Sequence, residues 1–175
     1  MPKSSNGPEL SKGPKLIRNG ELIENPWTVL DKDFSGEIGT DFVLVPKVYW
    51  LEQAESLVSK TNIGVWLDSD EGPEELAPYL DKLATIAINF PKFADGRGYS
   101  YARLLRDRYA FKGEILAFGD ILHDQLFYLK RCGFNAFVIR EDKDAEVAMA
   151  GLNDFSNSYQ AASDQPQPMF RRRAR

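Results

Sequence analysis

The sequence of 175 residues contains few of the side chains that bind redox centres. Cys132 is the only cysteine and His123 is the only histidine. A single cysteine excludes an internal disulfide and any four-cysteine cluster supplied by this chain alone. The sequence also lacks a Walker A motif and a GxGxxG fingerprint, so it favours neither a P-loop ATPase nor a standard dinucleotide enzyme. We therefore expect no intrinsic cofactor and no metal site.

Long apolar runs are absent as well. No run approaches the ~18 residues that a membrane span needs, and residues 1–6 contain no hydrophobic signal core. These absences predict a cytoplasmic protein with no membrane partner. Basic residues number 22 and acidic residues 26, and four of the arginines fall in the last five positions. The remainder of the chain is therefore acidic, which disfavours nucleic-acid binding.

The length and the hydrophobic fraction of 43% suit one well-buried α/β domain. Residues 1–14 hold proline, glycine, serine and lysine with almost nothing apolar to bury. Residues 156–175 repeat that character before a basic end. We predict flexible tails at 1–14 and 156–175 on either side of a single domain at 15–155.

The first element predicted in the domain is a β-hairpin. Residues 15–18 and 21–24 flank the dipeptide Asn19-Gly20, and Asn-Gly supplies the two positive-φ positions that a type I′ turn requires. Residues 27–30, which follow Pro26, are a candidate for a further short strand.

From Asp41 onward, short apolar runs alternate with longer stretches of helical period, which is typical of βα units and a mainly parallel sheet. We predict an α/β fold with five such units after the hairpin. They form either an open sheet or a partial TIM-like barrel that a partner or a second copy completes, so a homo-oligomer remains open. The second helical stretch lies behind Pro73, and the fourth stops at Gly133, which suits a helix cap. The predicted strands are 42–45, 63–67, 85–90, 114–118 and 136–139.

A glycine-bracketed loop follows the third predicted strand. Gly96 and Gly98 let the backbone approach a ligand closely. Arg97 and Arg103 could bind an oxyanion bidentately, with Ser100 as a helix cap or a further donor. This pattern predicts an anion site at the start of a helix.

The same loop has a simpler interpretation. Asp95-Gly96 can form a turn and Ser100 can cap a helix, while the arginines are solvated or paired with Asp95 and Asp107. The sequence leaves both interpretations open. Under the first, Asp95 is also a candidate catalytic carboxylate.

Charged residues follow the fourth and fifth predicted strands as well. Asp120 is placed to cap the next helix, and His123 in the first turn is a candidate acid or base. The alternative is a polar first turn that satisfies neighbouring backbone or binds a partner. Arg140, beside Glu141, joins the anion-binding candidates. Because the carboxyl ends of parallel strands meet at one edge, we predict that these residues and Asp95 share a rim.

The end of the chain combines a stiff Gln-Pro run with an aromatic residue and a cationic cluster. It is either a solubilising end or a docking peptide whose aromatic ring fills a pocket while its arginines engage an acidic partner. The docking candidates are Phe170, Arg171, Arg172 and Arg173.

Three runs carry a resemblance to a known family: FPKFADGRGYS at 90–100, GDILHDQLF at 119–127 and KRCGFNAF at 130–137. They resemble a bacterial domain-of-unknown-function family whose members are described as oxidoreductases involved in sulfite reduction. The resemblance spans residues 16–155 and is specific for the family but not for a reaction. Such members are typically encoded beside the haem-containing assimilatory sulfite reductase, which implies a role in sulfate assimilation and cysteine biosynthesis.

The resemblance also bears on the candidate residues. Related sequences commonly have arginine where this chain has His123. The resemblance therefore implies that Asp95, Arg97 and Asp120 are stronger site candidates than a catalytic histidine. The function expected first is an accessory protein that binds the sulfite reductase haemoprotein and aids substrate or electron delivery. The second is an enzyme whose carboxyl-edge loops bind an oxyanion or phosphate, and the third is a structural module that binds no small molecule.

Overall fold

The computed structural model describes residues 15–172, so the predicted tail at 1–14 and the docking candidate Arg173 lie outside the described residues. The predicted hairpin is confirmed: β1 (Lys15–Arg18) and β2 (Glu21–Glu24) pair antiparallel. Asn19 and Gly20 have φ values of 51° and 83°, as a type I′ turn requires.

Within the described residues, eight strands form a single sheet in the order β2-β1-β8-β7-β6-β5-β4-β3. β3 to β8 are parallel to one another, and β1 joins β8 antiparallel. Each of the predicted strands is present with small shifts at its ends. The parallel strands are β3 (Thr28–Val29), β4 (Val43–Pro46), β5 (Ile63–Leu67), β6 (Thr85–Phe90), β7 (Glu114–Gly119) and β8 (Ala136–Val138).

The connections between the strands are less regular than the five predicted βα units. The connection that follows β5 is a 3-10 helix with Pro78 inside it, not the predicted α-helix. The third helix passes into a π-helical turn. The connections are α1 (Lys47–Glu52), α2 (Ala54–Leu57), η1 (Glu74–Tyr79), α3 (Arg97–Arg103), η2 (Leu104–Arg108), α4 (His123–Cys132) and α5 (Ala145–Gly151), and α6 (Met169–Arg172) follows near the end.

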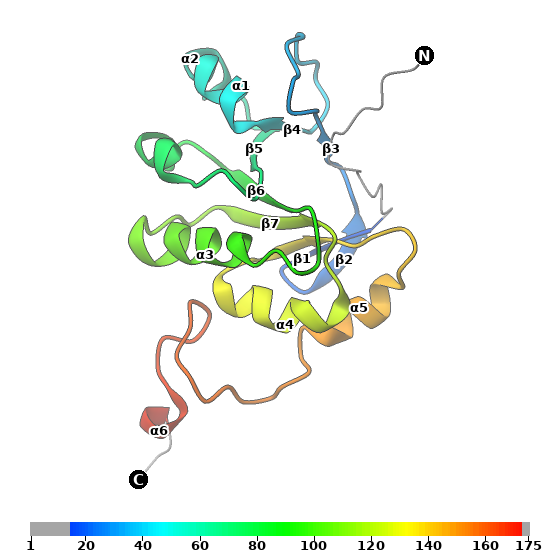
Figure 1. The fold of residues 1–175 in the computed structure, drawn as a ribbon, viewed down its shortest axis with the longest axis vertical. Helices are drawn as coiled ribbons and strands as arrows, with labels where there is room; N and C mark the ends of the chain where they lie inside the picture. Colours follow the sequence, from blue (N-terminus) through cyan, green and yellow to red (C-terminus); the bar gives the residue numbers. More distant parts are fainter. Residues whose placement is uncertain (1–14, 173–175) are drawn as a thin grey trace.

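The sheet is curled into a half-barrel, not closed into a TIM-like barrel, and the helices follow one another around its outside (Figure 1). β2 and β3 lie at opposite edges of the sheet, yet only residues 25–27 join them. Four Cα–Cα steps span at most about 15 Å, so the curl must bring the two edges near each other. Trp27 lies on this crossing and is buried in the inner core.

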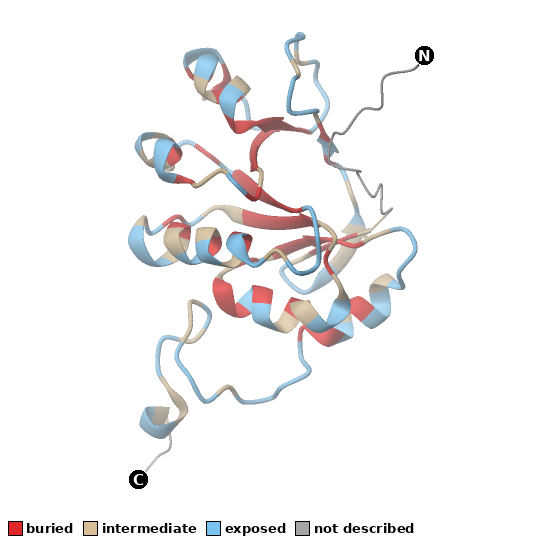
Figure 2. Cartoon of the chain, in the orientation of Figure 1, coloured by how far each residue is buried: buried red, intermediate tan, exposed pale blue. Residues whose placement is uncertain are grey.

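The inner face of the half-barrel is a packed apolar layer of its own. Trp66 is fully buried there, its ring stands edge-to-face on Phe118 at 6.1 Å, and its Nε1 donates to the Leu30 carbonyl at 2.9 Å. Burial runs along the central strands β4 to β8 and β1, whereas the edge strand β2 has no buried residue (Figure 2). The residues of this layer are Leu16, Trp27, Val29, Leu44, Trp66, Ala87, Leu116, Phe118, Ala136 and Val138.

The outer face holds a second and larger core, beneath the helices. α4 buries Leu126 and Leu129 against it and ends at Gly133, whose φ of 115° confirms the predicted cap. In the described part of the chain, no helix combines the length and the apolar character needed to cross a bilayer.

Candidate functional site

Polar residues replace apolar ones where the strands leave the inner core. Side chains alternate between the two faces of a strand, so the position two residues after an inner core residue faces inward again. Trp66 of β5 is followed in this way by Asp68, directly after the strand, and Ala87 is followed by Asn89 within β6. The same step leads from Phe118 to Asp120 and from Val138 to Arg140. These four polar residues define the carboxyl rim of the half-barrel.

On one side of the rim, Asp68 is held by three donors. Its Oδ1 accepts from the Asn89 amide at 3.0 Å and from the Ser69 N–H at 2.8 Å, and its Oδ2 accepts from Lys32 at 3.2 Å. Burial opposes ionisation of Asp68, but these hydrogen bonds outweigh it and hold the pKa below the usual value. Asn89 Oδ1 is buried at the rim with no partner in the described structure.

On the other side of the rim, Asp120 and Arg140 meet. Arg140 Nη1 donates to Asp120 Oδ1 at 2.5 Å, and the Phe93 N–H donates to Asp120 Oδ2 at 3.0 Å. Arg140 also forms a two-point pair with Asp142. Asp120 therefore ties three loops together. The expectation that it caps α4 is wrong, because the helix begins after Leu122, whose N–H is bonded by the Gln125 side chain.

The predicted anion loop folds around an internal ion pair. Arg97 donates to both carboxylate oxygens of Asp95, at 3.0 and 2.7 Å, and to the hydroxyl of Ser69 at 2.9 Å. The side-chain hydrogen bonds from Arg97 hold the pKa of Asp95 well below its ordinary range. Gly96 precedes the first residue of α3, and Gly98 packs so closely on Phe90 that a Cβ there would lie 2.7 Å from the ring.

Three predicted residues do not join these contacts. Arg103 pairs with Asp107 one turn further along, at 2.8 Å. Ser100 lies inside α3 and so does not cap it, since the cap position is Gly96. His123 is exposed at the first residue of α4, and no hydrogen bond of its ring occurs within residues 15–172.

Arg140 of the rim already contacts carboxylates, and so does Arg97, which donates to Ser69 next to the rim residue Asp68. An oxyanion entering here would compete with Asp95 for Arg97, and with Asp120 and Asp142 for Arg140. The buried acceptor Asn89 Oδ1 is available to a donor on a ligand or to water. No group of three His, Cys, Asp or Glu side chains suited to a metal ion occurs among the described residues.

Sequence analysis missed Lys32, Asp68 and Asn89. Asn89 is the one amide in the otherwise apolar run of β6, which was a usable signal. Asp68 directly follows β5, in the same position relative to its strand as Asp120 relative to β7. Lys32 had no signal, because residues 27–30 were only a candidate short strand, and it is the parallel pairing of β3 with β4 that places the following loop at the carboxyl edge of the sheet.

The low pKa of Asp68 leads to a stability prediction. A carboxylate with a depressed folded-state pKa contributes stability above its unfolded pKa of about 3.9, and the contribution is lost as pH falls through the folded value. Replacing Asp68 by Asn should therefore lower the free energy of unfolding by about 1 kcal/mol at neutral pH. The difference from the native chain should shrink steadily below about pH 4. Urea unfolding between pH 7 and strongly acidic conditions measures both effects.

Asp33→Asn is the matched control, because Asp33 is exposed and belongs to no ion pair in the described structure. It should unfold like the native chain at every pH. A difference for Asp68→Asn that does not depend on pH would show that the rim hydrogen bonds do not favour the ionised form of Asp68.

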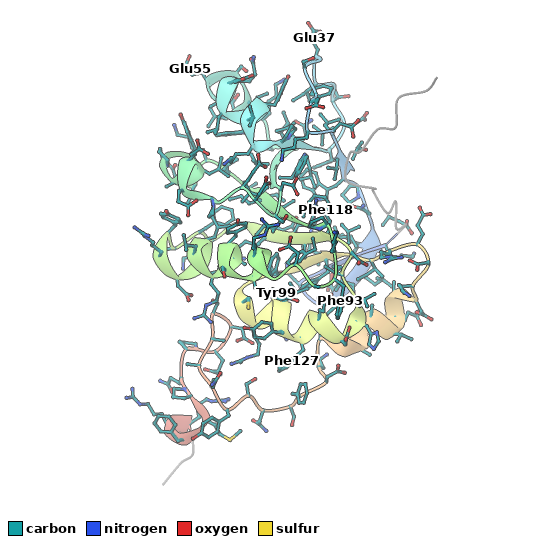
Figure 3. All side chains as sticks on the ribbon, viewed as in Figure 1. Glu37, Glu55, Phe93, Tyr99, Phe118 and Phe127 are labelled. Carbon is teal, nitrogen blue, oxygen red and sulfur yellow. The ribbon has the colours of Figure 1, made fainter. Side chains whose placement is uncertain are left out.

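Several aromatic side chains lie on α4, the helix that follows the Asp120 loop, and on the segments beside it. Tyr99 and Tyr128 contact each other with ring centroids 5.2 Å apart, and Phe127 contacts Phe155 at 5.0 Å. The Gln125 side chain donates to the Phe93 carbonyl and to the Tyr99 hydroxyl. Figure 3 shows Phe93, Tyr99 and Phe127 around this helix. We call this set the α4 surface: Phe93, Tyr99, Phe127, Tyr128 and Phe155.

The C-terminal segment, residues 156–172, follows Phe155 of the α4 surface along the chain. Arg131 on α4 is buried and donates to the Gln160 carbonyl at 2.5 Å and to Asp164 at 3.2 Å. Arg172 donates to the Ser158 carbonyl at 2.6 Å. The predicted flexibility of 156–175 stays a prediction.

Of the docking candidates in this segment, Phe170 is 61% exposed and Arg171 lies over its ring at 5.9 Å. Both belong to α6. Arg172, by contrast, is turned back onto the chain by its bond to Ser158.

A family model described as bacterial protein of unknown function (DUF934) matches residues 64–170. The match begins inside β5, covers the rim from Asp68 to Arg140, and ends in α6, so it includes the C-terminal segment and excludes the hairpin. A comparison with curated proteins gave no match. Since the family model covers more than half of the sequence, the chain belongs to the bacterial DUF934 family.

Proposed function

We propose that this chain is an accessory protein of assimilatory sulfite reduction that binds the sulfite reductase haemoprotein and aids its supply of substrate or electrons. The resemblance to proteins of sulfite reduction supports the pathway. The α4 surface supports a binding role. The rim gives little support for a catalytic role, because Arg140 and the neighbouring Arg97 already form ion pairs with carboxylates of the chain.

The exposed aromatic rings of the α4 surface are the observation that carries this proposal. Tyr128 of α4 is 58% exposed, and Phe155, whose ring contacts Phe127 of α4, is 65% exposed. Aromatic residues are enriched at the centres of protein interfaces, where each ring buries a large area at a low cost in side-chain entropy. Rings exposed together in this way mark a surface that a partner covers.

The test is calorimetric titration of purified sulfite reductase with the chain. The native chain should bind, and the double variant Tyr128→Ser/Phe155→Ser should bind at least about 30-fold more weakly, the loss expected from truncating hot-spot aromatics. Phe170→Ser tests separately whether the exposed ring of α6 takes part.

Val48→Ser is the control, since Val48 is an exposed apolar residue on α1, far along the sheet from α4. It should bind like the native chain. Absence of binding by the native chain, or native affinity in the double variant, would reject the proposal.

A second candidate function is an enzyme with an oxyanion or phosphate site at the carboxyl rim, in which Asp120 or His123 would transfer protons and Asp95 would stay ionised beside Arg97. The observation that favours it is the inward-facing polar position at the end of each of four neighbouring strands, the place where barrel enzymes hold their ligands. Titration of the native chain and of Arg97→Ala with sulfate and phosphate distinguishes this candidate, because binding at the rim should weaken when Arg97 is removed, whereas anion binding elsewhere on the chain should not change.

A further inference from the structure

A cleft of about 420 Å³ opens at the other end of the half-barrel, away from the carboxyl rim. It lies between the ends of α4 and α5 and the turn of the hairpin. Its volume falls within the range of small-molecule sites in proteins. The residues that the argument uses are Arg106, Lys130, Phe137, Met149, Leu152 and Asp164.

The floor of the cleft is apolar. Phe137 of β8 belongs to the outer core, and Leu152 and Met149 come from the end of α5. One wall is Asp164 of the C-terminal segment, which is fixed in place by the buried Arg131. Phe137 and Leu152 are almost fully buried and form the base of the cleft, and the half-buried Met149 adds exposed apolar surface.

Arg106 lines the cleft, and no carboxylate among residues 15–172 balances its charge. Its guanidinium donates to the carbonyls of Gly133, Phe111 and Gly113 at 2.7–2.9 Å, and to Asn135 Oδ1 at 3.3 Å. In the part of the chain that the structure describes, it forms no ion pair. Burial lowers its pKa, with no acidic neighbour to oppose the shift.

A second cation stands at the same cleft. Lys130, in the last turn of α4, is exposed and has no ion-pair partner between residues 15 and 172. The only acidic side chain lining the cleft within the described residues is Asp164, and Arg131 already pairs with it. The cleft thus combines an apolar floor with an excess of positive charge, and a partly buried cation without a counter-ion favours an anionic ligand.

We propose that this cleft binds a small molecule with an aromatic or aliphatic body and one anionic group, such as a carboxylate, phosphate or sulfonate. The apolar body lies on Phe137, Met149 and Leu152. The anionic group faces Lys130 and the positive potential of Arg106. This site is separate from the α4 surface and does not depend on the proposed function.

The probe is 1-anilinonaphthalene-8-sulfonate, an aromatic anion whose fluorescence rises when it is bound. The native chain should bind it saturably at one site. Lys130→Glu, which reverses the charge, and Met149→Trp, which fills the floor, should each weaken binding at least about tenfold. The uncharged analogue N-phenyl-1-naphthylamine should also bind the native chain at least about tenfold more weakly.

Lys82→Glu is the matched control, because Lys82 is exposed, lies outside the cleft and makes the same charge change. It should bind the probe with native affinity. An unchanged thermal midpoint in each variant excludes binding to unfolded chain. Absence of saturable binding, or native affinity in both cleft variants, would overturn the proposal, as would equal affinity for the uncharged analogue.

Discussion

Replacing Trp66 by alanine should lower the free energy of unfolding by about 3–5 kcal/mol, the range for removing a large aromatic from a packed core. Trp66 is fully buried on the inner face of the half-barrel, where its ring contacts Phe118 and its Nε1 donates to Leu30. Urea unfolding measures the loss.

Trp66→Phe separates packing from the hydrogen bond. It keeps an aromatic ring and removes the Nε1 donor, so its cost should be nearer 1–2 kcal/mol. A small cost for Trp66→Ala, within about 1 kcal/mol of the native chain, would mean that the inner face is not the closed apolar layer described above.

Gly119→Ala should be the second most damaging single change, at about 3 kcal/mol or more. Gly119 ends β7 with a φ of +98°, and a Cβ built there would lie 2.4 Å from the Phe90 carbonyl oxygen and 2.8 Å from Asn89 Oδ1. The first contact is with backbone, which cannot move without breaking the β6–β7 pairing. The effect appears in the free energy of unfolding.

Gly20→Ala is the matched comparison, since Gly20 also has a positive φ but has open space where the Cβ would stand. It should cost only about 1 kcal/mol, the strain of the backbone conformation alone. Equal costs at the two positions would show that Gly119 is not in close contact with β6.

The strands were predictable because each is a short apolar run whose ends are marked by polar residues. β5 and β6 have the predicted limits, and the hairpin follows from Asn19-Gly20. The shape of the sheet was not predictable. Its curl depends on the short link at 25–27, and nothing local in that sequence indicates which edge it crosses to.

The candidate site was predicted in part. The expectation that Asp120 and Arg140 converge follows from parallel strands alone, and the structure brings them together. The sequence could not predict that the arginines form ion pairs within the chain, because each of them could equally have faced solvent or a ligand. Asp95 and Arg97 are two residues apart, and the turn between them decides that they bind each other.

The cleft with Arg106 and Lys130 was beyond sequence reasoning for a different reason. One of its walls comes from residues 156–172, whose composition predicts flexibility. Arg131 holds this segment in place, but in the sequence Arg131 looks like any basic residue near the end of a helix. Contacts between elements far apart in the chain create the site.

Sulfide formation from sulfite in cells lacking this chain is the most direct test of the proposed accessory role. Loss of the chain should slow sulfide formation, the native chain should restore it, and Tyr128→Ser/Phe155→Ser should not, although it accumulates to the same level. Unchanged sulfide formation in cells without the chain would contradict the account.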